Sequence, residues 1–136
     1  MSTRLKDKQE KILQVLTGLR EESAKGIPIV VEGKKDLEAL HGFSIAGPIL
    51  TVKTGGKSFI EALHEIEQTG SSEVILLLDF DRRGRQGTST LKANLERAKI
   101  KPNLGFWRAF SALVGREIQC IESLTSYMQT LEKKTM

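Results

Sequence analysis

Cysteine, histidine and aromatic residues are all scarce in this chain of 136 residues. Its one cysteine, Cys120, cannot form an internal disulfide, and His41 and His64 have no further cysteine or histidine at metal-ligand spacing, so we expect no zinc site. We interpret Cys120 as a small buried residue of a predicted strand, and both histidines as surface or packing residues. The lack of disulfides is typical of a cytoplasmic, reducing compartment.

Long apolar runs are lacking as well. No stretch is long enough to cross a bilayer, and residues 1–11 lack the apolar region of a signal peptide, so no membrane partner is expected. The chain length supports one hydrophobic core, which must be mainly aliphatic because only 5% of the residues are aromatic. We therefore predict a single domain overall, in which an N-terminal helix within residues 1–26 packs on a domain formed by residues 27–136.

Strand and helix patterns alternate along the chain. Apolar residues at helical spacing predict an amphipathic helix over residues 2–25, ended by Gly26. Aliphatic runs predict strands over residues 27–31, 48–53, 73–78 and 117–121. Between and after them, helices are predicted around Asp36 as far as Gly42, over residues 57–68, over residues 86–99 with a start at Thr88 or Ser89, around residues 106–114, and over residues 123–132. This alternation predicts an α/β fold with about four parallel strands flanked by helices.

Two of the predicted strands run directly into acidic residues. Residues 27–31 are followed by Glu32, and residues 74–78 are followed by Asp79 and, one residue later, Asp81. The carboxyl ends of parallel strands lie at one edge of a sheet, so the three carboxylates should converge there. Carboxylates this close repel one another unless a cation intervenes, and Mg²⁺ prefers oxygen ligands of this kind. We predict that Asp79 and Asp81 hold the ion, and that Glu32 completes its shell or transfers protons.

Two other interpretations of the aspartates remain open at this point. Asp79 and Asp81 can be turn or cap residues whose charge Arg82 and Arg83 neutralise. Alternatively, an Asp-x-Asp after a hydrophobic strand is typical of phosphatases that form an aspartyl-phosphate. The two arginines occupy the stretch where those enzymes carry a Thr or Val, which disfavours the phosphatase.

The segments VVEGKKDLEAL and LLLDFDRRG, residues 30–40 and 76–84, resemble the two signature motifs of the Toprim domain. Primases, topoisomerases and small nucleases that mature ribosomal RNA share this domain. The resemblance covers roughly residues 27–121 and implies a Rossmann-like fold, an Mg²⁺ cofactor that Mn²⁺ could replace, Glu32 as general acid or base, and Asp79 and Asp81 as metal ligands. The remaining motif and loop positions are Gly33, Asp36 and Gly84, with Gly55 and Gly56 in a small-residue loop near the active site.

The chain also departs from the family's larger members. Arg83 stands where topoisomerases commonly carry a further acid, which favours one metal ion over two. The only tyrosine, Tyr127, falls in the predicted last helix, where a partly buried structural role is favoured over that of a nucleophile. The length leaves no room for the zinc-binding and helical regions of primases. The resemblance is therefore to a minimal, stand-alone Toprim protein.

Basic residues cluster just past the predicted strand ends, and the net charge of +4 suits a polyanionic partner. As a group they can bind the phosphates of a nucleic acid; they are Lys34, Lys35, Lys53, Lys57, Arg82, Arg83 and Arg85. Phe106, Trp107 and Phe110 have helical spacing, which favours core packing over base stacking.

The leading hypothesis is an Mg²⁺-dependent nuclease or phosphotransferase that acts on nucleic acid, with RNA favoured over DNA. The alternatives are a non-catalytic nucleic-acid-binding adaptor in a larger complex, a primase-like nucleotidyl transferase, and a hydrolase of a small phosphorylated substrate. The N-terminal helix can pack on its own domain or on a second copy of the chain, so a homodimer stays open.

Overall fold

The computed structural model describes residues 3–53 and 58–136. Four strands form one sheet in the order β2-β1-β3-β4, and every neighbouring pair is parallel. The strands are β1 (Ile29–Val31), β2 (Ile49–Thr51), β3 (Glu73–Leu77) and β4 (Lys101–Asn103). This arrangement confirms the predicted α/β fold with four parallel strands.

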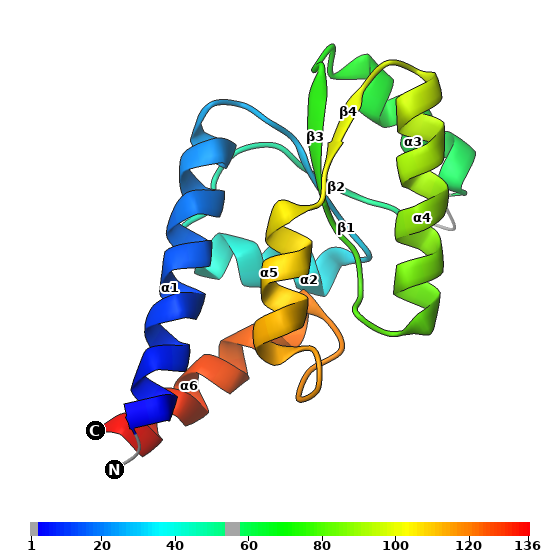
Figure 1. Cartoon of the computed structure of the whole chain (residues 1–136). Coiled ribbons are helices and arrows are strands. Elements are labelled where there is room, and N and C mark those ends of the chain that lie inside the picture. The colour runs from blue at the N-terminus through cyan, green and yellow to red at the C-terminus, as the bar shows by residue number, and fades with distance from the viewer. Residues whose placement is uncertain (1–2, 54–57) are drawn as a thin grey trace.

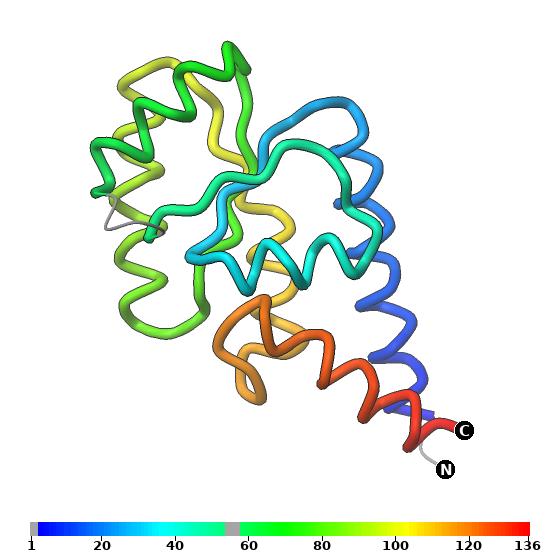
Figure 2. Tube along the Cα trace, turned by 180° about the vertical axis from the view of Figure 1, so that it is seen from behind, coloured from blue at the N-terminus to red at the C-terminus, as the bar shows by residue number. Residues whose placement is uncertain are grey.

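Helices cover both faces of the sheet (Figures 1 and 2). They are α1 (Thr3–Ala24), α2 (Lys34–Gly42), α3 (Phe59–Gln68), α4 (Arg82–Arg97), α5 (Gly105–Val114) and α6 (Leu124–Thr135), with a short 3₁₀ turn at Ile121–Ser123. Side chains alternate between the faces along each strand, so Val30 and Leu76 pack beneath α3 and α4 while Val31 and Leu77 pack toward α1, α5 and α6. No helix in the described ranges is long and apolar enough to cross a membrane.

The N-terminal helix α1 belongs to the core of the second face. Its residues Ile12, Leu16 and Leu19 are fully or almost fully buried in the same cluster as Phe110 of α5 and Leu131 of α6. Both termini lie at the same end of the molecule, where α1 and α6 run side by side (Figure 1). The amphipathic face of α1 is therefore covered by its own chain.

The prediction of a fourth strand over residues 117–121 is wrong. The fourth strand is β4, which pairs with β3, and residues 117–120 form a loop in which the Gln119 carbonyl accepts a hydrogen bond from the Phe80 amide at 2.6 Å. Ile118 and Ile121 are apolar because they enter the core from this loop, not because they alternate along a strand. β4 has no hydrophobic signature because it is a short edge strand of Lys, Pro and Asn, a position that tolerates proline.

The start of α4 also differs from the prediction at Thr88 or Ser89. The helix begins at Arg82, and Asp81 is its N-cap, with Oδ1 accepting a hydrogen bond from the Gly84 amide at 2.8 Å. Thr88 lies buried inside the helix and donates to the Gly84 carbonyl. A Cβ on Gly84 would collide with the Asp79 carbonyl oxygen, so glycine allows the first turn of α4 to approach the end of β3.

Candidate metal and phosphate site

Two neighbouring strands deliver the acidic residues to one edge of the sheet. Val31 pairs with Leu77 and with Thr51, so Glu32 follows β1 at the same level at which β3 ends, and Asp79 lies just beyond that end. The pKa of Asp79 is raised to about 7. Burial is the largest cause, followed by the charges of Glu32, Asp36 and Asp81 in that order. The structure therefore brings the three predicted acids into one electrostatic cluster.

Glu32 is the most unusual member of this cluster because it is only 7% exposed and one of its carboxylate oxygens lacks a hydrogen bond from any described residue. Its Oε2 atom has no aligned hydrogen-bond donor among the described residues, although the Lys53 Nζ lies 3.1 Å away as an ion pair. Lys53 follows β2, and its amide donates to the Glu32 carbonyl at 3.0 Å. A buried carboxylate with a single, half-exposed lysine partner is poorly satisfied, which is costly unless another ligand completes it.

Asp36 has a structural role within the cluster. Its Oδ2 accepts from the Gly33 amide at 3.1 Å, which caps α2, and its Oδ1 accepts from the Glu122 amide at 2.8 Å, which fastens the 3₁₀ turn to α2. The side chain is 5% exposed, and burial raises its pKa. Both carboxylate oxygens are already engaged, so Asp36 shapes the site and adds negative charge to it.

Cys120 is a neighbour of the acids that the sequence did not reveal. Ligand atoms of Asp36, Asp79 and Cys120 all lie within 4.8 Å of one another, a group that includes neither Glu32 nor Asp81. Cys120 is half-buried in the loop that contacts Phe80, so the expectation that it is a buried strand residue is wrong. A thiolate suits softer metals than Mg²⁺, and we therefore place Cys120 beside an Mg²⁺ site and not in its ligand set.

The donor set fits Mg²⁺ on two observations. In the described part of the chain, neither Glu32 Oε2 nor the Asp79 side chain accepts a well-formed hydrogen bond, and burial followed by the neighbouring carboxylates raises the pKa of Asp79, which a bound cation would offset. Asp81 uses Oδ1 as a helix cap and retains a second oxygen. Oxygen atoms from one to three carboxylates, completed by water and substrate phosphates, are the ligands that Mg²⁺ takes in proteins.

The backbone structure requires glycine at only one of the two motif glycines. Gly84 is required by its close approach to Asp79, as described above. Gly33 has an extended backbone (φ −147°), and a Cβ there would meet nothing within 4 Å. Neither packing nor conformation demands glycine at this position, which leaves open space directly beside Glu32.

Of the seven basic residues predicted to bind phosphate, Lys53 and Arg83 line one pocket together with Glu32. Lys34 and Lys35 are exposed in the first turn of α2, and Arg82, Arg83 and Arg85 are exposed in the first turn of α4. Lys57, Gly55 and Gly56 lie outside the described residues. Within α4, no acidic side chain occupies the first turn, so three arginines stand at the positive end of the helix dipole. The N-cap Asp81 supplies one negative charge at this end of α4, and the remaining excess of positive charge suits a bound anion.

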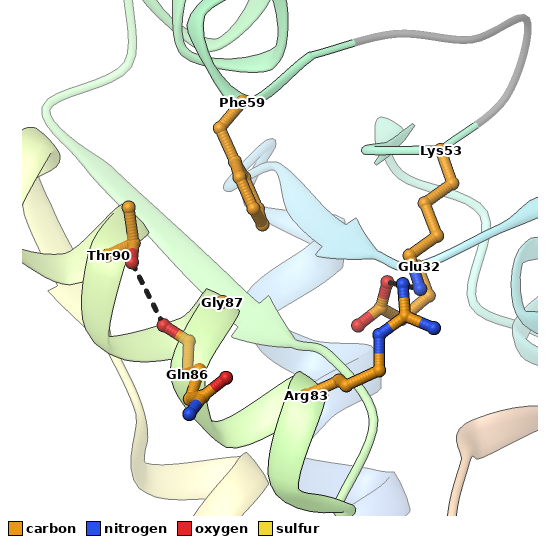
Figure 3. A pocket seen from close by; sticks show the side chains of 7 residues that line it. All are labelled: Glu32, Lys53, Phe59, Arg83, Gln86, Gly87 and Thr90. Atoms are coloured by element: carbon orange, nitrogen blue, oxygen red, sulfur yellow. Dashed lines mark hydrogen bonds and ion pairs between the residues drawn. The ribbon is translucent and has the colours of Figure 1, made fainter.

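A pocket of about 320 Å³ opens beside Glu32, between the ends of β1 and β2, the start of α3 and the side of α4. Lys53 and Arg83 point toward Glu32 in this pocket, and Phe59 and Gln86 form the walls (Figure 3). The pocket therefore combines a buried carboxylate with two cationic side chains, a combination that can hold a phosphate next to a metal ion.

The aromatic and histidine predictions are confirmed for the most part. Phe110 is fully buried, and Trp107 packs against both core clusters while its indole N–H donates to the Leu78 carbonyl at 2.8 Å. Tyr127 is half-buried beneath the ammonium group of Lys8, which agrees with a structural role. His41 and His64 are exposed.

Comparison with known proteins shows the family to which the chain belongs. The model of the Toprim domain family matches residues 27–111, more than half of the chain. The chain therefore belongs to the Toprim family, whose members are Mg²⁺-binding enzymes of nucleic acid.

Individual relatives are similar over most of their length. The chain is 33% identical to a UPF0292 protein of Methanosarcina acetivorans, over 93% of this chain and 85% of the relative, and 34% identical to a UPF0292 protein of Methanocaldococcus jannaschii, over 88% and 91%. A solved structure of a protein from Aquifex aeolicus superimposes with a TM-score of 0.67 at 28% identity, covering 81% of this chain and 94% of that one.

Proposed function

We propose that this protein is an Mg²⁺-dependent enzyme that cleaves phosphodiester bonds in nucleic acid, with RNA favoured over DNA as substrate. The observation that carries the proposal is Glu32, a carboxylate only 7% exposed whose Oε2 lacks an aligned hydrogen bond, held beside Asp79 at the end of the sheet. Such a poorly satisfied carboxylate does not stabilise the fold, so a role in the reaction better explains its position.

Asp79 and Asp81 would hold the metal ion, with Glu32 close to it. The ion, when bound, neutralises charge on the phosphate and acts as a Lewis acid. Arg83 and Lys53 line the same pocket and would position the phosphate by charge-assisted hydrogen bonds. Because the Lys53 side chain is 52% exposed, it can turn from Glu32 toward a phosphate without leaving a buried position.

Glu32 would move the protons of the reaction. In hydrolysis the oxygen of a water molecule bonds to phosphorus and the bond from phosphorus to the leaving oxygen breaks. The attacking water loses one proton, and the leaving oxygen gains one. Glu32 can accept the first proton and return it to the leaving oxygen, so that no other reactant is needed.

Glu32→Gln tests this role because it removes the proton acceptor and keeps the shape. The assay follows cleavage of labelled single-stranded RNA, duplex RNA and single-stranded DNA with Mg²⁺, and binding by fluorescence anisotropy. We expect cleavage to fall by about 10²–10⁴-fold with binding changed less than about threefold. Glu38→Gln, an exposed acid of α2, is the matched control and should cleave normally. Unchanged cleavage by Glu32→Gln would remove the basis of the proposal.

A non-catalytic adaptor is the second candidate, and the ion pair between Lys53 and Glu32 favours it. A lysine 3.1 Å from the carboxylate neutralises the charge that a metal would otherwise balance. Binding of RNA without cleavage by the unmodified protein, with or without Mg²⁺, would support the adaptor. Adding labelled nucleoside triphosphates tests nucleotidyl transfer in the same assay, and p-nitrophenyl phosphate tests the small-molecule hydrolase.

A further inference from the structure

The pocket beside Glu32 is the first of three adjoining hollows around α4. Gln86 and Thr90 line both the first hollow and a second one on the outer side of the helix. Arg85 and Ser89 line both the second hollow and a third one of about 290 Å³ between α4 and α5. The three hollows therefore form one continuous surface from Glu32 to α5.

This surface is strongly basic. Its lining contains six cationic side chains and one acid, Glu32; the cations are Lys53, Arg82, Arg83, Arg85, Lys92 and Arg108. Of these six cations, only Lys53 forms an ion pair with an acid within the described ranges. Five unpaired cations on adjoining hollows repel one another, so the surface suits a partner that carries several negative charges.

Three of the cations, together with one serine, have a regular spacing along α4. Arg82, Arg85, Ser89 and Lys92, which we call the α4 stripe, are separated by three or four residues and so share one side of α4. The stripe is about 15 Å long at the rise of an α-helix, which is enough to contact successive phosphates of one strand. A free nucleotide would occupy only part of it.

The hollow between α4 and α5 adds an aromatic wall. Trp107 lines it together with Lys92 and Arg108, and the hydrogen bond from its indole N–H to Leu78 fixes the ring. Although the ring is half-buried in the core, the part that borders the hollow can contact an unpaired base. Cations combined with an aromatic surface favour a single strand over a duplex, whose bases are stacked on one another.

We propose that the α4 stripe and the hollow between α4 and α5 bind the backbone of a single-stranded nucleic acid and direct it to Glu32. This inference rests on the proposed function for the chemistry at the end of the path. Backbone contacts carry no sequence information, so single strands of different sequence should bind with similar affinity.

The test combines a triple variant with a control of equal charge. The path variant carries Arg85→Gln, Lys92→Gln and Arg108→Gln, which remove three cations of the path. The control variant removes three exposed cations elsewhere: Lys6→Gln in α1, Arg116→Gln in the loop after α5, and Lys133→Gln in α6. Binding of a labelled single-stranded RNA is measured in EDTA at several salt concentrations. We expect at least tenfold weaker binding for the path variant, under threefold for the control, and a salt slope lower by about 2 for the path variant alone.

Fluorescence of Trp107, the only tryptophan, gives a second readout. The bound strand should quench it in the unmodified protein and in the control, and the double variant Arg85→Gln with Arg108→Gln, whose replaced side chains are exposed, should lose this quenching without a change in fold. Equal binding by the path and control variants, binding without quenching, or tighter binding of duplex than of single strands would each overturn the inference.

These outcomes are separable from those of the proposed function. Weaker binding by the path variant, in a protein that cleaves nothing, would support the path and contradict the enzyme. Normal cleavage and binding by the path variant, in a protein that depends on Glu32, would contradict the path and leave the enzyme standing.

Discussion

Replacing Asp79 with asparagine should stabilise the metal-free protein at alkaline pH. The pKa of Asp79 is raised from its ordinary 3.8 to about 7, first by burial and then by the neighbouring carboxylates. A carboxyl group with a raised pKa binds more protons in the folded state, so its contribution to stability falls as the pH rises from about 4 to about 7. Above that range the folded state bears the whole cost of the charge.

The full difference between the two pKa values corresponds to about 4 kcal/mol. Asp79 is only half-buried, and solvent screening reduces the effect, so we expect Asp79→Asn to raise the free energy of unfolding by about 1–2 kcal/mol at pH 8 in EDTA. The gain should shrink as the pH falls toward 4, where the native Asp79 is already protonated. Saturating Mg²⁺ should reverse the order, because only the unmodified site binds the ion fully.

Urea unfolding followed by circular dichroism at pH 8 and pH 5, with EDTA and with Mg²⁺, measures these differences. Asp7→Asn, an exposed acid of α1, is the matched control and should change the free energy by less than about 0.5 kcal/mol. Destabilisation by Asp79→Asn in EDTA at pH 8, or a gain of equal size at both pH values, would refute the reasoning.

Four further variants test the parts of the site. Gly84→Ala should destabilise by more than about 3 kcal/mol because its Cβ meets the backbone of Asp79, whereas thermal unfolding of Gly33→Ala should shift little; equal effects would contradict the assigned roles. Asp36→Ala should cost about 2–4 kcal/mol in urea unfolding through the loss of two hydrogen bonds to backbone amides, and a cost near zero would argue against its structural role. Cys120→Ser should change Mg²⁺-dependent cleavage by less than about threefold. Loss of cleavage in this variant would indicate instead that the thiol binds the metal ion.

The fold could be predicted where burial produced a continuous apolar run. Residues 74–78 form the most hydrophobic segment of the chain, and β3, like β1, lies between two neighbouring strands. β4 was not predicted because a short edge strand does not need a continuous apolar run. The start of α4 escaped it because Gly84 and Gly87 weaken local helix propensity, and only packing against β3 and Phe59 explains them.

The candidate site, like the fold, could be predicted only in part. Glu32, Asp79 and Asp81 could be predicted to converge because strand ends in a parallel sheet share an edge. The positions of Asp36 and Cys120 could not, since they depend on contacts between α2 and the loop after α5, which are far apart in the sequence. The dual role of Asp81 as helix cap and candidate ligand follows only once α4 is seen to begin beside it.

Anomalous diffraction from crystals grown with Mn²⁺, an oxygen-preferring stand-in for Mg²⁺, tests the central claim most directly. The account predicts one peak per chain, with carboxylate oxygens of Asp79 and Asp81 at about 2.0–2.2 Å and Glu32 facing the ion. A peak bound by Asp36 and Cys120, or a Glu32 side chain turned away from an ion held elsewhere, would contradict it.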